Sequence, residues 1–189
     1  MSVVSTVEIP RKIWTRADTR LLVELGFPNA EKLELIDGEI IQKTGKNPRH
    51  MLWQNLILGW LHAIFGSEYV QGEPSIYVSA EDVPTNEPEP DLIVTTKSIR
   101  EYKDNVTPAD IRLIIEVADT TLRFDLGKKA RLYARAGIVE YWVVDIPNSL
   151  VHVHRVPVQD AYTSLVKYNF GENITPLADP KAIICLERL

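Results

Sequence analysis

Two short, almost purely apolar runs each carry one carboxylate, and this pattern constrains the fold more than any other feature of the chain. Asp91 opens the run DLIVT, and Glu116 lies near the end of the run RLIIEV. Both runs predict buried β-strands, because they are short, apolar and rich in β-branched residues. A carboxylate buried in such a strand is costly unless a partner compensates its charge. The sequence therefore predicts a sheet that holds acids in its interior.

The rest of the chain predicts helices and strands in an irregular order. Three helices are expected from their capping residues and apolar spacing: residues 16–26, 48–64 and 126–137, after the N-caps Thr15, Asn47 and Asp125. Strands are expected in a hairpin over 31–42, turning at Asp37-Gly38, and at 91–95, 110–117, 140–145 and 151–156, with a last pair at 162–169 and 182–189. Residues 69–79 are also strand-like, although Gly72 and Pro74 interrupt them. Residues 99–105 predict at most a helical turn. This order predicts one α/β (α+β) domain over residues 1–189, with a mixed β-sheet flanked by helices and a core from about residue 15 to 185.

The composition of the chain bears on where the protein works and on how it could bind nucleic acid. The chain has 189 residues, enough for one hydrophobic core, and a single cysteine, Cys185, which excludes an internal disulfide. No apolar run is long enough to span a membrane, and the N-terminus does not resemble a signal peptide. We therefore expect a cytoplasmic protein that does not enter a membrane. The net charge of −5 argues against tight, nonspecific binding to duplex nucleic acid.

Carboxylates on two neighbouring strands repel each other unless a cation lies between them. A hard divalent cation, Mg²⁺ or alternatively Mn²⁺, meets that need. Lys129 follows Glu116 by thirteen residues, and its amine could orient water or offset charge on a phosphoryl group. The trio Asp91, Glu116 and Lys129 is the minimum set for metal-assisted phosphodiester hydrolysis. On spacing alone another interpretation stays open, in which Asp91 is solvated, Glu116 pairs with Arg112 or Arg131, and Lys129 lies on the surface.

Longer segments carry a family resemblance. PEPDLIVT, the stretch 113–145, and the earlier LIDGEI and NPRH together resemble the Uma-type family of proposed restriction endonucleases, within the PD-(D/E)XK nuclease superfamily. The resemblance implies a restriction-endonuclease-like fold with Asp91 and Glu116 as metal ligands. The superfamily's E-x-K pattern would place lysine at position 118, where this chain has Ala118. The family is similar to variants that supply the lysine from the next helix, and Asp125 and Lys129 match that D-x-x-x-K pattern.

Several other polar residues are candidates for the same site. The resemblance places Glu39 and His50 where the family carries polar groups, and Glu73 would join them if its strand pairs with 91–95. Tyr133 lies one helical turn after Lys129 and its phenol could reach the site, although helix packing is the more common role of such a residue. The basic residues around this helix could follow a phosphate backbone or form a solvated, ion-paired face: Arg123, Lys128, Arg131 and Arg135.

The expected function is a Mg²⁺-dependent endonuclease that hydrolyses phosphodiester bonds, with DNA as its substrate. The acidic charge and the missing lysine at position 118 leave an alternative open, a catalytically inactive nuclease fold that binds a protein or nucleic-acid partner. A third interpretation is an acidic subunit that works only in an assembly such as a homodimer, with residues 141–145 and 151–156 near its interface.

Overall fold

The computed structural model describes residues 11–43, 45 and 47–189 and has the mixed α and β architecture that the sequence predicts. The strands are β1 (Leu33–Ile36), β2 (Glu39–Gln42), β3 (Val70–Gly72), β4 (Leu92–Thr95), β5 (Ile111–Ala118), β6 (Glu140–Asp145), β7 (Leu150–Val158) and β8 (Ala161–Asn169). The helices are α1 (Arg16–Glu24), α2 (Pro48–Phe65), α3 (Leu122–Phe124) and α4 (Ala130–Arg135). A π-helical turn, Asp125–Lys129, joins α3 to α4.

The main sheet has six strands in the order β3-β4-β5-β6-β7-β8. Every neighbouring pair is antiparallel except β5 and β6, which are parallel. A parallel pair needs a crossover connection, and here the chain crosses through α3, the π-helical turn and α4. The topology therefore places this helical segment directly after the strand that carries Glu116.

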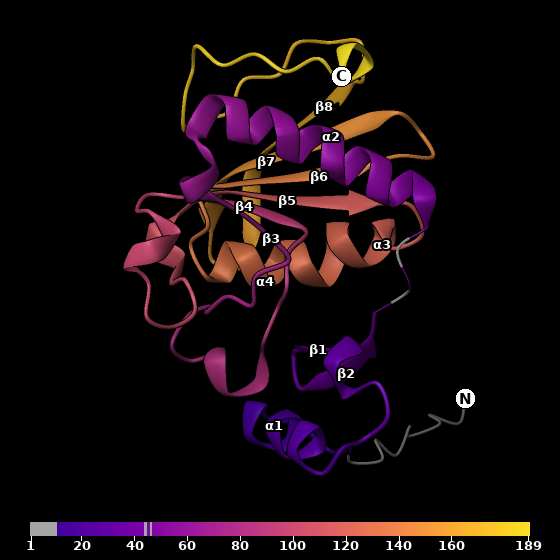
Figure 1. Cartoon of the computed structure of the whole chain (residues 1–189), viewed down its shortest axis with the longest axis vertical. Helices are drawn as coiled ribbons and strands as arrows, with labels where there is room; N and C mark the ends of the chain where they lie inside the picture. The colour runs from indigo at the N-terminus through magenta and orange to yellow at the C-terminus, as the bar shows by residue number, and fades with distance from the viewer. Residues whose placement is uncertain (1–10, 44, 46) are drawn as a thin grey trace, which may run out of the picture.

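Helices cover the two faces of the sheet (Figure 1). Side chains alternate between the faces along each strand, and each face has its own core. Leu113, Ile115 and Val117 pack with Ile57 and Leu61 of α2. Ile114 and Ala118, which lie on the opposite face, pack with Tyr133 of α4. By the same alternation, Glu116 faces α4.

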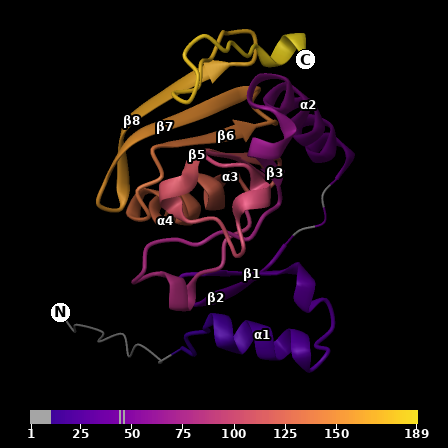
Figure 2. The same cartoon turned by 60° about the vertical axis from the view of Figure 1, so that its left-hand side comes forward.

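The N-terminal part of the chain lies beside this sheet as a smaller unit of α1 and the β1–β2 hairpin (Figure 2). Thr15 caps α1 in a reciprocal capping box with Asp18. The hairpin turns where Asp37 and Gly38 have φ angles of 49° and 71°, as expected for an Asp-Gly turn. A bridge between Leu35 and Glu87 attaches the hairpin to the loop before β4.

Three expectations about the elements are wrong. The helix after β5 begins at Leu122 with Thr121 as its N-cap, not at Asp125, because Asp125 is buried and its carboxylate accepts a hydrogen bond from Thr121. The strand expected at 69–79 is cut to Val70–Gly72, since Glu73 has a φ of 55°. Residues 182–189 do not pair with β8, which pairs with β7 instead.

Three other expectations concern a helical turn, an interface and membrane-spanning segments. Residues 99–101 form the helical turn. Strand β6 is buried along its whole length, and β7 is buried from Val151 to His154, whereas Val156 is exposed. The interface expected near these segments stays a prediction. Among the described residues, no helix combines the length and the apolar character needed to cross a membrane.

Candidate active site

The register between β4 and β5 brings the two strand carboxylates together. Leu92 pairs with Ile115 in this antiparallel ladder, so Asp91, just before β4, lies beside Glu116. The Asp91 main-chain N–H donates to Glu116 Oε2 at 3.3 Å, and the Val117 N–H donates to Asp91 Oδ2 at 2.7 Å. Main-chain donors therefore hold both carboxylates, which are only 8% and 3% exposed.

Lys129 is the buried partner of Glu116. Its Nζ lies 2.9 Å from Glu116 Oε1 and 3.0 Å from Glu34 Oε1, and the residue is 5% exposed. Arg131 pairs with Asp160 instead, and Arg112 donates to the Ala178 carbonyl. The geometry thus excludes the alternative in which Glu116 pairs with an arginine and Lys129 lies on the surface. The lysine reaches Glu116 from the π-helical turn, a feature that often marks functional sites.

Glu34 is a site residue that the sequence analysis missed. It lies in β1, is 5% exposed, and also accepts a hydrogen bond from the Glu89 N–H at 2.9 Å. The sequence did contain a signal, because Glu34 stands in the short apolar strand LELI. This is the same pattern of an acid on an apolar strand that identified Asp91 and Glu116.

Other polar side chains orient these groups. Tyr133 donates its hydroxyl hydrogen to Glu116 Oε1 over 3.0 Å, and His50 Nε2 lies 3.2 Å from Asp91 Oδ1. Gln54 donates to Glu73 Oε1 at 3.2 Å and to the Asp91 carbonyl at 3.3 Å. Contacts of this kind fix the direction in which a carboxylate presents its oxygens.

Burial dominates the electrostatics of the site. It raises the pKa of Glu116 well above the ordinary value, although the charge of Lys129 opposes the shift. Burial also disfavours the charged form of Lys129, but Glu116 and Glu34 outweigh it and raise the lysine's pKa. Burial raises the pKa of Asp125 to about 6. The cavity thus holds more carboxyl groups than one lysine can pair with, and burial disfavours their ionised forms, so a bound cation would favour ionisation of these carboxylates.

These groups line a cavity of about 350 Å³ between the N-terminal hairpin and the main sheet. Seven of its lining residues carry carboxylates: Glu34, Glu73, Glu89, Asp91, Glu116, Asp119 and Asp125. The candidates His50, Glu73 and Asp125 thus line the same cavity as the proposed trio. Tyr133 does not line it, but its hydroxyl group donates to Glu116. Across the described part of the chain, no three His, Cys, Asp or Glu side chains already converge as a metal-ligand group.

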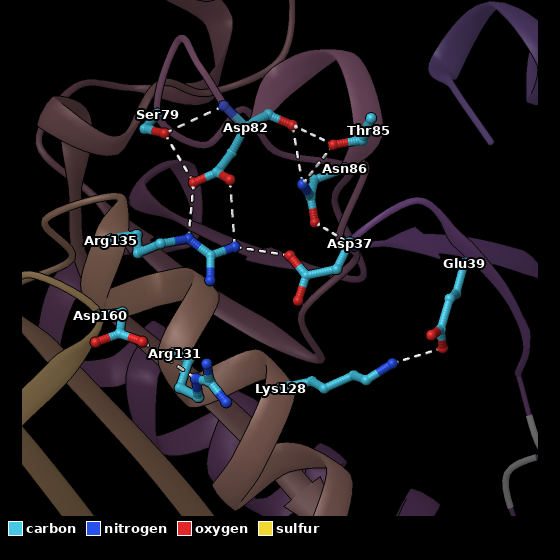
Figure 3. Close-up of polar contacts among 10 residues, drawn as sticks. All are labelled: Asp37, Glu39, Ser79, Asp82, Thr85, Asn86, Lys128, Arg131, Arg135 and Asp160. Atoms are coloured by element: carbon cyan, nitrogen blue, oxygen red, sulfur yellow. Dashed lines mark hydrogen bonds and ion pairs between the residues drawn. The ribbon is translucent and has the colours of Figure 1, made fainter. Parts of the chain in front are cut away.

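Glu39 and the basic residues of the helix do not line this cavity. Figure 3 shows Glu39, Lys128, Arg131 and Arg135 with their ion-pair partners. Glu39 is half exposed and forms an ion pair with Lys128 at 2.5 Å. Arg135 binds Asp37 at 2.7 Å and Asp82 at 3.0 Å, and Arg131 pairs with Asp160. Three of the four basic residues are therefore ion-paired to carboxylates, as expected for a solvated face. Arg123 is exposed.

Comparisons with known proteins agree with this architecture. A solved structure described as "a putative nuclease belonging to DUF820 from Anabaena variabilis ATCC 29413" matches with a TM-score of 0.66 and 16% sequence identity, over 87% of this chain and 93% of that chain. At this identity the likeness shows a shared fold. No curated protein matches the chain. The family described as "Putative restriction endonuclease" matches residues 19–183, which is most of the chain. The protein therefore belongs to this restriction-endonuclease-type family.

Proposed function

We propose that the protein is a Mg²⁺-dependent endonuclease that hydrolyses phosphodiester bonds in DNA. The observation that carries the proposal is the adjacency of Asp91 and Glu116 in a carboxylate-lined cavity, with the Lys129 amine 2.9 Å from Glu116. Family membership supports nuclease chemistry in general. The metal is proposed from the chemistry of the donor set, and DNA is proposed from the description of the family as restriction endonucleases.

The carboxylates fit a hard cation that keeps part of its water shell. Mg²⁺ is commonly bound by one or two carboxylates together with water and substrate oxygens, so a preformed group of three ligands is not required. Asp91 and Glu116 would hold the ion, and Mn²⁺ could replace it. When bound, such an ion polarises a phosphoryl oxygen and lowers the pKa of bound water.

The remaining residues position groups and balance charge. Lys129 carries its positive charge beside Glu116, where it can orient the attacking water or offset the negative charge that develops on the phosphoryl group. Tyr133 holds Glu116 Oε1, and His50 holds Asp91 Oδ1. Both are positioning residues, because they act through the two carboxylates.

Isosteric substitutions test the proposal. Asp91→Asn and Glu116→Gln keep the shape of each side chain but remove the charge that a cation needs, so each should reduce Mg²⁺-dependent DNA cleavage by at least about a hundredfold, roughly 2.7 kcal/mol in the barrier. Asp160→Asn, an exposed carboxylate paired with Arg131, is the matched control and should cleave normally. Cleavage by both site variants at the control rate would refute the assignment.

A second candidate is a non-catalytic member of the same fold that binds a protein or nucleic acid. The ion pair of Lys129 with two carboxylates favours it, because Lys129 already occupies Glu116 Oε1. Calorimetric titration separates the two candidates. Binding of Mn²⁺ that Glu116→Gln abolishes supports the nuclease, whereas no heat of binding at millimolar metal supports the non-catalytic module.

A further inference from the structure

We infer that the cavity accepts an unpaired nucleotide strand, rather than an intact duplex, an inference that rests on the nuclease function proposed above. The groups proposed to act on a phosphate are all buried. Asp91, Glu116 and Lys129 are 8%, 3% and 5% exposed, and the cavity beside them measures about 350 Å³. A scissile phosphate must therefore enter the cavity, because these side chains do not project from the surface.

The wall of the cavity restricts what can enter. Ile41 and Gln42 of the hairpin, with Lys43, Gly45 and Asn47, form one side. Polar contacts join that side to the rest of the protein. Glu34 contacts Lys129, Lys43 pairs with Glu89, and Asn47 donates to Asp119. Duplex DNA is stiff, with a persistence length of about 150 base pairs. A single strand bends at every nucleotide and can lead one phosphate inside.

The charge around the cavity also favours a single strand over a duplex. Proteins that bind duplexes usually present a basic face to the two phosphate backbones. Here seven carboxylates line the cavity, and Lys128, Arg131 and Arg135 are each paired with an acid outside it. Such surroundings repel a dense array of phosphates. They tolerate one phosphodiester brought in with a cation, together with a neutral base.

Phe124 supplies a surface for that base. It lies at the end of α3, is half-buried and lines the cavity. Its ring centroid lies 6.0 Å from Lys129 Nζ, so a base stacked on it would belong to a nucleotide next to the scissile phosphate. Every base has a π-face, so aromatic stacking binds single strands with little sequence preference. Phe124 is not part of a run of aromatic residues, so the sequence does not reveal this role.

Binding of two fluorescent probes tests the inference without requiring cleavage. The probes are a single-stranded twelve-nucleotide DNA and a duplex of the same sequence closed at both ends by hairpin loops, titrated in Ca²⁺ and followed by anisotropy. We expect the single strand to bind at least tenfold more tightly than the closed duplex. Equal or tighter binding of the duplex would overturn the inference.

Substitution of Phe124 tests the stacking surface. Phe124→Ala should weaken single-strand binding by about tenfold, the loss expected for one stacked base. Phe124 also packs against Ile36, Val78 and Leu132, so Phe124→Leu is the second variant, because it keeps apolar volume but removes the ring. Phe27→Ala is the matched control, since Phe27 is 53% exposed and does not line the cavity.

Both Phe124 variants should lose affinity for the single strand while circular dichroism stays unchanged, and Phe27→Ala should bind normally. Normal affinity in folded Phe124→Leu would overturn the role of the ring. The same proteins are then assayed for cleavage in Mg²⁺. Tight single-strand binding without any cleavage would refute the nuclease function and leave the strand preference standing, so the two failures are distinguishable.

Discussion

The N-terminal hairpin is attached to the helix after β5 in two places that differ in their exposure to water. In the interior, Glu34 pairs with Lys129, and their side chains are 6% and 7% exposed. At the surface, Glu39 pairs with Lys128, and these side chains are 51% and 40% exposed. Two adjacent lysines thus contact two acids of one hairpin, one pair in the candidate site and one in solvent.

The comparison shows that solvation, rather than residue type, decides what such a pair contributes. An exposed pair contributes about 0–1 kcal/mol, because water screens it and its long side chains lose freedom. Removal of one partner from a buried pair typically costs about 3–5 kcal/mol, since a charge is left buried and uncompensated. We therefore expect the two lysines to differ sharply when each is replaced.

The largest effect is expected at Lys129. Lys129→Met should lower the free energy of unfolding by about 3–5 kcal/mol, because Glu34 and Glu116 lose their shared cation. Lys128→Met, one residue away, is the matched control and should cost about 1 kcal/mol or less. Denaturant unfolding of both variants measures the difference. Equal stabilities for the two variants would remove the distinction between the buried and the exposed pair.

A smaller effect is expected from the pKa of Asp125. Burial raises that pKa from 3.8 to about 6, so the ionised carboxylate destabilises the metal-free fold. Stability from this group is full below pH 3.8 and is lost as pH rises to about 6. Asp125→Asn removes this dependence. The free energy of unfolding of the wild-type protein relative to this variant should therefore change by about 1–3 kcal/mol across this pH window.

Denaturant unfolding in the presence of a chelator, at intervals from pH 4 to pH 7, measures this effect. The stability of the wild-type protein relative to Asp125→Asn should fall as the pH rises through the window. A constant difference would contradict the raised pKa of Asp125.

The smallest effect is expected at Arg135, which joins Asp37 and Asp82 at the surface (Figure 3). Arg135→Ala should cost about 1 kcal/mol or less in dilute buffer. The cost should shrink in 1 M NaCl, where the Debye length is about 3 Å. Thermal unfolding at both salt concentrations provides the test, and a loss above 2 kcal/mol that salt does not reduce would show that this surface network acts like a buried one.

The sequence predicted the strand carboxylates well because the cost of burying an acid is visible in a local pattern. Asp91 and Glu116 stand out in apolar runs, and the register of β4 and β5 brings them together. Capping residues likewise predicted α1 and α2 at Thr15 and Asn47.

Contacts between distant segments could not be predicted in the same way. Glu34 meets Lys129 only because the hairpin folds back on the main sheet, and the apolar strand around Glu34 does not reveal that partner. The π-helical turn depends on how Asp125 and Lys129 are buried together, whereas capping rules placed Asp125 at a helix start. Strand β3 ends at Gly72, one of the two residues expected to interrupt it, but the left-handed φ of Glu73 has no signal in the sequence.

The central claim is that Asp91 and Glu116 together hold a divalent cation beside Lys129. A crystal structure of the protein soaked in Mn²⁺, with data collected for anomalous scattering from manganese, tests it most directly. We predict an anomalous peak between the two carboxylates that is lost in Glu116→Gln. A wild-type crystal without a peak at this position in millimolar Mn²⁺, or a peak that Glu116→Gln leaves unchanged, would contradict the claim.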